Sequence, residues 1–82
     1  MEIKVLGTGC AKCTKLEDLT KEVLGELGVQ ADVIKVSDVK EIAKLGVLMT
    51  PGLVVNGQVK VSGKLPSKGD LTSIITSELA KE

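Results

Sequence analysis

The chain has 82 residues, enough for one small domain but not for a second hydrophobic core. Hydrophobic residues make up 43% of it and predict a folded globule, yet Phe, Tyr and Trp are absent, so no aromatic ring can stack on a base or a sugar. Lysines and acidic residues balance at a formal net charge of 0, which argues against a nucleic-acid partner or a polybasic membrane patch.

The start of the chain predicts a cytoplasmic protein. Glu2 and Lys4 interrupt the apolar residues, so a signal peptide with its run of about seven apolar residues is not expected. No segment approaches the roughly 20 apolar residues of a transmembrane helix. Because the chain begins with Met1, we also expect no removed leader. In the cytoplasm, a lone close cysteine pair is more often catalytic or metal-binding than a structural bridge.

A strand and a long helix open the predicted fold. Residues 2–7 are largely apolar and form the strand. The helix is expected from about Cys10 to Leu27, and Gly28 suits the left-handed conformation that ends it. Its apolar residues recur at steps of three and four: Cys13, Leu16, Leu19, Val23, Leu24 and Leu27. Glu17 and Lys21 form a favourable pair on the exposed side.

A second strand and a short helix follow. The strand covers residues 31–36, and either Ser37 or Asp38 can cap the helix, which ends near Gly46. The apolar residues of this helix are Val39, Ile42, Ala43 and Leu45.

The second half of the chain predicts a hairpin and a last helix. Residues 53–55 form a third strand, Asn56-Gly57 is a two-residue hairpin turn, and Val59 and Val61 alternate on a fourth strand. Residues 67–70 open the last helix with a spacing like that of a capping box. The inner stripe of this helix is Leu71, Ile74, Ile75 and Leu79. The predicted order is therefore β-α-β-α-β-β-α.

The only two cysteines of the chain stand in Cys10-Ala11-Lys12-Cys13, where the first strand gives way to the first helix. Two thiols this close can form a small disulfide, and the unpaired amides at a helix start favour the thiolate of Cys10. Cys13 lies on the apolar stripe and should be shielded. The pattern predicts a thiol–disulfide centre in which Cys10 attacks and Cys13 resolves the mixed disulfide.

Two metal sites and one further role compete with this interpretation. A structural zinc site needs two more ligands, and the chain has neither a histidine nor a third cysteine. Copper-chaperone-like modules bind Cu(I) with a similar cysteine pair, but they usually carry Met two residues before it, where this chain has Thr8, and their order is β-α-β-β-α-β. A docking domain in which the pair only senses redox state remains open.

The motifs Thr8-Gly9-Cys10-Ala11-Lys12-Cys13 and Thr50-Pro51-Gly52-Leu53-Val54-Val55-Asn56-Gly57 resemble those of the small thioredoxin-like, glutaredoxin-sized redox-active disulfide proteins of archaea and anaerobic bacteria. The resemblance covers essentially the whole chain, so residues 1–82 are expected to form a single domain. It implies an α/β, minimal thioredoxin fold: a four-stranded mixed sheet of order 2-1-3-4 flanked by three helices. It also implies a cis Thr50–Pro51 bond packed against the cysteines.

The resemblance further implies a monomeric thiol–disulfide oxidoreductase, either a protein-disulfide reductase or an electron carrier. Its substrates would be disulfide-containing proteins, its reductant a thioredoxin-reductase-type flavoenzyme, and it would need no bound cofactor. Thr50 and Pro51 would bind the substrate, with the Thr50 backbone pairing with an extended segment. Gly9, Ala11 and Lys12 complete the candidate substrate-binding residues. Lys12 could equally be a solvated helix-start residue, Ala11 a filler and Gly9 a device of the loop.

The chain departs from its larger relatives at several positions. Lys4 stands where thioredoxins carry a buried acid, and Gly9 stands where they carry Trp. Of the glutaredoxin residues that hold glutathione, only Ser62-Gly63 and the more distant Asp70 remain, so glutathione is not the expected partner.

Overall fold

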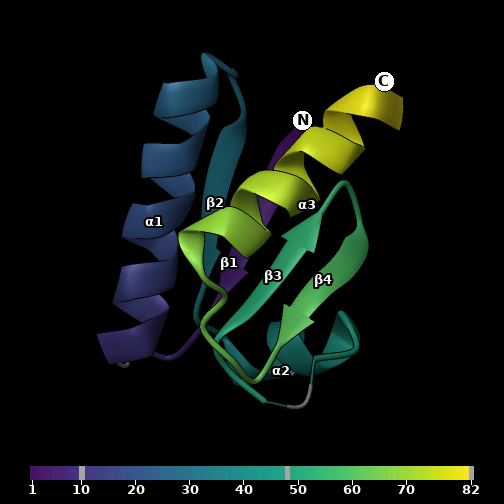
Figure 1. The fold of residues 1–82 in the computed structure, drawn as a ribbon. Coiled ribbons are helices and arrows are strands. Elements are labelled where there is room, and N and C mark those ends of the chain that lie inside the picture. The colour runs from purple at the N-terminus through teal and green to yellow at the C-terminus, as the bar shows by residue number, and fades with distance from the viewer. Residues whose placement is uncertain (10, 48, 82) are drawn as a thin grey trace.

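The computed structural model describes residues 1–9, 11–47 and 49–81. Its elements are β1 (Glu2–Leu6), α1 (Ala11–Leu27), β2 (Asp32–Val36), α2 (Val39–Lys44), β3 (Gly52–Val55), β4 (Gln58–Ser62) and α3 (Lys68–Lys81). The sheet has the order β2-β1-β3-β4, with β1 parallel to β2 and the β3–β4 hairpin antiparallel to β1. This arrangement confirms the predicted minimal thioredoxin fold (Figure 1).

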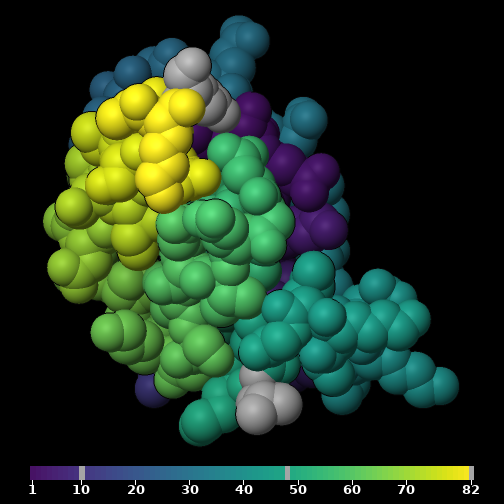
Figure 2. Space-filling view, turned by 90° about the vertical axis from the view of Figure 1, so that its right-hand side faces the viewer, coloured from purple at the N-terminus to yellow at the C-terminus, as the bar shows by residue number. Residues whose placement is uncertain are grey.

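The helices cover the two faces of the sheet unequally. Successive side chains of a strand point to opposite faces, so β1 contributes to a core on each side. The larger core, between the sheet and helices α1 and α3, contains Ile3, Val5, Leu16, Val23, Leu24, Leu53, Val55, Val61, Leu71 and Ile75. The smaller core, beneath α2, contains Leu6, Ile42, Val47 and Val54. Figure 2 shows that α2 (teal) covers only the lower part of the sheet face against which it packs.

The position of Lys4 follows from this unequal cover. Lys4 alternates with Ile3 and Val5, so it shares the α2 face with Leu6, beyond the part that α2 covers. Its side chain is 31% exposed, and its Nζ lies 3.6 Å from the carboxylate of Glu2. A charged residue is tolerated in this central strand because the short helix leaves that part of the face in contact with solvent.

The helix caps and the hairpin turn form at residues that favour them locally. Asp38, rather than Ser37, caps α2, because its Oδ1 accepts a 2.8 Å hydrogen bond from the amide of Lys40. The hydroxyl of Ser67 accepts a 3.1 Å hydrogen bond from the amide of Asp70 at the start of α3. The left-handed pair Asn56 (φ 50°) and Gly57 (φ 82°) forms the predicted hairpin turn.

The inner stripe of α1 differs from the prediction at its end. Leu27 is 39% exposed, so its predicted place on the buried stripe is wrong. The helix ends at Gly28 (φ 67°), and Val29 packs against the larger core instead, with its amide bonded to the carbonyl of Leu24. Thr20 is fully buried on the stripe, where its hydroxyl donates a 2.7 Å hydrogen bond to the carbonyl of Leu16. None of the helices in the described part of the chain is long and apolar enough to span a membrane.

Glu78 is a buried carboxylate that joins α3 to the hairpin. It is 5% exposed, and its Oε2 lies 3.4 Å from the Nζ of Lys60 and 3.3 Å from that of Lys81. The side-chain amide of Asn56 donates to its Oε1 at 3.4 Å, and the same Asn56 accepts from the amide of Glu2 at 2.9 Å. Desolvation raises the pKa of Glu78, but the hydrogen bonds and charges of Lys81 and Lys60 outweigh it, so the pKa lies below its ordinary value.

We expect Glu78→Gln to lower the denaturant midpoint at pH 7. A lowered pKa means that the carboxylate stabilises the fold above its unfolded-state pKa, near 4.5, and that this stabilisation is lost as pH falls through the lower folded-state pKa. Unfolding curves of the wild type and the variant should therefore converge in acid. Glu41→Gln is the matched control, because its pair with Lys44 (3.5 Å) is exposed and should change stability by less than about 0.5 kcal/mol. A Glu78→Gln difference that is independent of pH would contradict this account.

Candidate functional site

Cys13 lies in the first turn of α1 and is 1% exposed, as predicted for a shielded thiol. The β1–α1 loop approaches it closely at Gly7. A Cβ at position 7 would lie 2.6 Å from the Cβ of Cys13 and closer still to its Sγ, whereas real Cβ atoms essentially never come within 3.0 Å. Only glycine therefore allows this loop to pass Cys13. Cys10 lies outside the described residues, so the geometry of the cysteine pair stays a prediction.

The loop that carries Gly7 and Gly9 is attached to the sheet. The amide of Gly7 donates a 2.9 Å hydrogen bond to the carbonyl of Val36, which extends the pairing of β1 with β2 past Leu6. Gly9 has φ +94°, a left-handed conformation that favours glycine. The backbone conformation of Gly9 and the close approach at Gly7 both favour glycine in this loop.

The peptide bond between Thr50 and Pro51 is cis. In the antiparallel register Leu6 lies opposite Gly52, so continuing both strands by one residue sets Gly7 opposite Pro51. The carbonyl of the buried Pro51 accepts a 2.9 Å hydrogen bond from the amide of Gly63, which follows β4. The Thr50–Pro51 segment is thus bonded to the residue that follows β4 and lies beside the loop that touches Cys13, at the lower end of the sheet in Figure 1.

Gly52, which follows Pro51 in the sequence motif, is a supporting residue whose contacts the sequence did not predict. A Cβ there would lie 3.0 Å from Cγ1 of Val47, 3.3 Å from the carbonyl oxygen of Val61 and 3.5 Å from Cδ1 of Leu6. The close packing of these residues fixes the strand that follows Pro51. The sequence signal for this position is the glycine itself, directly after Pro51, whereas its pairing with Leu6 is visible only in the structure.

None of the remaining candidate residues is buried. Gly9, Ala11 and Lys12 are exposed, and Thr50 is half-buried. Lys12 takes part in none of the ion pairs found among residues 1–9, 11–47 and 49–81. Met49, before Thr50, is 66% exposed; a Cβ at Gly63 would lie 3.0 Å from its Cβ.

The electrostatics at the start of α1 favour a negative charge. The first turn of the helix, Ala11 to Thr14, contains no acidic residue that would cancel the partial positive charge of the free amides, and it contains Lys12. In the described part of the chain, no three His, Cys, Asp or Glu side chains gather as potential metal ligands. The observed order of elements also differs from the β-α-β-β-α-β order of copper-chaperone-like modules.

Comparison with known proteins agrees with this architecture. Residues 1–76 match the thioredoxin domain family. The chain is 37% identical over 76 residues to a thioredoxin of Methanothermobacter thermautotrophicus, covering 93% of this chain and 99% of that protein. It is 38% identical over 77 residues to a thioredoxin of Methanocaldococcus jannaschii, covering 94% and 88%.

These matches define a small protein of the thioredoxin class. The chain belongs to the thioredoxin domain family, as the sequence motifs indicated. Membership supports thiol–disulfide oxidoreductase activity at the level of the family, with disulfide substrates and a reductase partner in general.

We expect Gly7→Ala to destabilise the protein by about 1–3 kcal/mol, because the added methyl group overlaps Cys13 and forces the loop to move. Gly25→Ala is the matched control. Gly25 lies inside α1, and a Cβ at this position would have no atom within 4 Å, so alanine there should stabilise the helix by about 0.5–1 kcal/mol. Denaturant unfolding of both variants measures the two effects. Equal stability of Gly7→Ala and the wild type would show that the close approach is not required.

Proposed function

We propose that residues 1–82 form one thioredoxin-like domain that reduces disulfide bonds in other proteins with Cys10 and Cys13. The observation that carries this proposal is the burial of Cys13 against Gly7, beside the Thr50–Pro51 segment. A thiol shielded in this way suits the resolving role, and it leaves the attacking role to Cys10.

The proposed reaction has two exchange steps. The Cys10 thiolate attacks one sulfur of the substrate disulfide; that S–S bond breaks, the other substrate sulfur leaves as a thiolate, and a mixed disulfide forms. The Cys13 thiolate then attacks the Cys10 sulfur and releases the second substrate sulfur. The substrate has gained two electrons, and the domain holds a Cys10–Cys13 disulfide. A thioredoxin-reductase-type flavoenzyme returns the two electrons, so no cofactor bound to the domain is required.

We propose that the substrate chain is bound by Thr50, Gly9, Ala11 and Lys12. Thr50 and Pro51 directly precede the start of β3, and the backbone of Thr50 would pair with an extended segment of the substrate, as in strand addition. Gly9, Ala11 and Lys12 would lie against the same segment from the other side. Lys12 would also add positive charge beside Cys10. We propose that the domain acts as a monomer in the cytoplasm.

We expect Cys10→Ser to abolish the domain's catalysis of insulin reduction, with either dithiothreitol or a reductase as the source of electrons. Cys13→Ser should instead retain a thiol that forms mixed disulfides, because only the resolving step is lost. Trapping in native extract with Cys13→Ser, followed by non-reducing electrophoresis and mass spectrometry, should recover protein partners joined to Cys10. Cys10→Ser is the matched control and should recover none.

The same experiment separates the alternatives. If Cys13→Ser traps nothing and the wild type binds Cu(I) tightly, the pair is a metal site and the proposed reaction is wrong. If adducts form but the wild type does not reduce insulin, the domain is a redox sensor.

A further inference from the structure

The two edges of the sheet differ in how they are protected. Strands β2 and β4 are the edge strands. The β4 edge is interrupted by a register shift at Leu53/Val54, and its Lys60 turns to the buried Glu78. Such bulges and charges normally block the pairing of a further strand. Strand β2 pairs with β1 in unbroken register over all five residues, and it contains no proline. The β2 edge therefore lacks the irregular pairing found at the β4 edge, but it carries Asp32 and Lys35, so a strand that pairs here has to match these charges.

The hydrogen-bond pattern shows which backbone groups β2 presents outward. The amide of Asp32 donates to the carbonyl of Met1 at 3.0 Å, and the carbonyl of Val36 accepts from Gly7 at 2.9 Å. In a parallel ladder, alternate residues direct both backbone groups to the same neighbour, so Asp32, Ile34 and Val36 face β1. The N–H and C=O groups of Val33 and Lys35 then point away from the sheet, where an added strand would pair.

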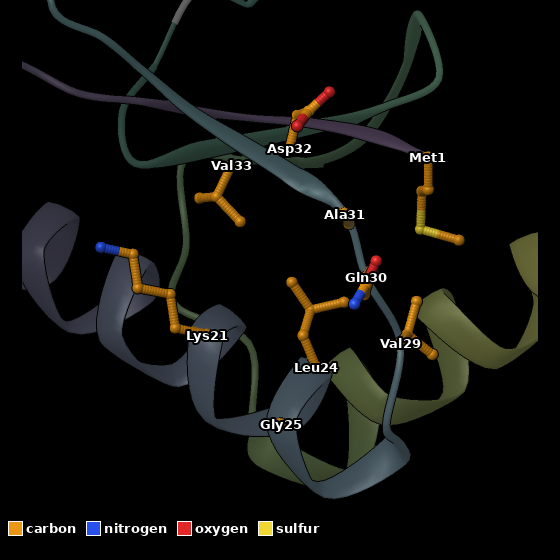
Figure 3. A pocket seen from close by; sticks show the side chains of 9 residues that line it. All are labelled: Met1, Lys21, Leu24, Gly25, Val29, Gln30, Ala31, Asp32 and Val33. Carbon is orange, nitrogen blue, oxygen red and sulfur yellow. The ribbon is translucent and has the colours of Figure 1, made fainter.

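A hollow lies beside this edge, between β2 and the last turns of α1. Its volume is about 750 Å³. In Figure 3 the side chains of Leu24 and Val33 point toward one another across it, Lys21 lies at its rim, and the carboxylate of Asp32 points to the opposite side of the strand. Two apolar side chains, Leu24 and Val33, thus face the hollow, and the charged side chain of Lys21 also lines it.

Gly25 also lines this hollow, and local structure does not require glycine there. It lies inside α1, it is not among the residues with positive φ, and no atom lies within 4 Å of a Cβ built on it. Glycine inside a helix lowers helix stability. Glycine at position 25 leaves the wall of the hollow without a side chain.

We propose that β2 binds an extended segment of a partner protein as an added antiparallel strand, at a site separate from the cysteine pair. The segment residue opposite Val33 points to the same side of the sheet as Val33 and places an apolar side chain in the hollow. Lys35 lies on that side too and makes none of the ion pairs found in the described part of the chain. An acidic residue opposite Lys35 matches its charge, so the segment carries an acidic residue and, two positions later, an apolar one.

A second copy of this chain fits the edge less well. Residues opposite one another in an antiparallel pair share a face, so two β2 strands can be centred on Val33 or on Ile34. The first arrangement places Lys35 opposite Ala31 of the other copy, and the second places it opposite Val33. Neither supplies an acidic partner. The charge of the edge therefore favours a different protein over self-association.

The hollow lies far from the start of α1. At a rise of 1.5 Å per residue, Gly25 is about 20 Å along α1 from Ala11. Lys35 lies nearer to that end of the sheet, because it directly precedes Val36, whose carbonyl accepts from the amide of Gly7. The variant of the hollow, Gly25→Leu, should therefore leave insulin reduction unchanged.

The test is a titration of the ¹⁵N-labelled protein with an N-acetylated, C-amidated octapeptide of threonines whose third residue is glutamate and whose fifth is leucine. Saturable chemical-shift changes should appear for the outward amides of Val33 and Lys35 and for the amide of Gly25, with smaller changes for the amide of Ile34. The peptide with leucine third and glutamate fifth is the control and should bind more weakly, because antiparallel pairing then misplaces both side chains. No saturable shift at millimolar peptide, or equal binding of the control peptide, overturns the proposal.

Two variants test the contacts. Gly25→Leu should fill the hollow and weaken binding by about tenfold or more, since the peptide leucine loses its site. Lys35→Glu should weaken it by about two- to fivefold, and a peptide with lysine in place of glutamate should restore binding to this variant. Unchanged binding by Gly25→Leu, failure of the charge exchange, or a concentration-dependent dimer in sedimentation that Gly25→Leu abolishes would each contradict the proposal.

Discussion

The site depends on the close approach of Gly7 to Cys13. That approach requires strand β1 to be held on both sides, because Gly7 is positioned by β2 through its bond to Val36 and lies opposite Pro51 in the register with β3. Any shift of β1 relative to either neighbour would move the loop against or away from the buried sulfur of Cys13. The central strand therefore sets the distance between the first turn of α1 and the Thr50–Pro51 segment, and the sheet serves mainly to keep it in place.

The rest of the chain supports this strand with few residues. Two long helices bury one face of the sheet, whereas the six-residue α2 covers only the end of the other face, beneath Leu6. That end is where the loop, Val47 and Gly52 meet, so the limited cover is placed next to the site. Farther along the strand, the same face is open enough to admit Lys4. The single helix on this face is thus sufficient for the site and leaves other parts of the sheet accessible, including the edge at β2.

The order of elements could be predicted because each carries its own local signal: apolar periodicity in α1 and α3, Asn56-Gly57 in the hairpin, and Ser67 at the start of α3. The sheet order came from the resemblance, since local patterns do not specify which strands pair. Contacts between distant residues could not be predicted. Periodicity predicted that Leu27 is buried, but in the folded chain Leu27 is exposed and Val29 packs against the larger core. Gly7 was predicted at the end of the first strand, yet its contact with Cys13 depends on three-dimensional register that no local pattern contains.

The central claim is that the buried Cys13 resolves and that Cys10 attacks. The rate of alkylation of each thiol in the fully reduced protein tests this claim most directly, measured with iodoacetamide at several pH values and quantified by mass spectrometry of the peptides. The account predicts that Cys10 reacts first and that its thiolate persists at pH values below the ordinary thiol pKa of about 8.5. Cys13 should react slowly, because it is 1% exposed. Alkylation of Cys13 at the same rate as Cys10, or faster, would contradict the account.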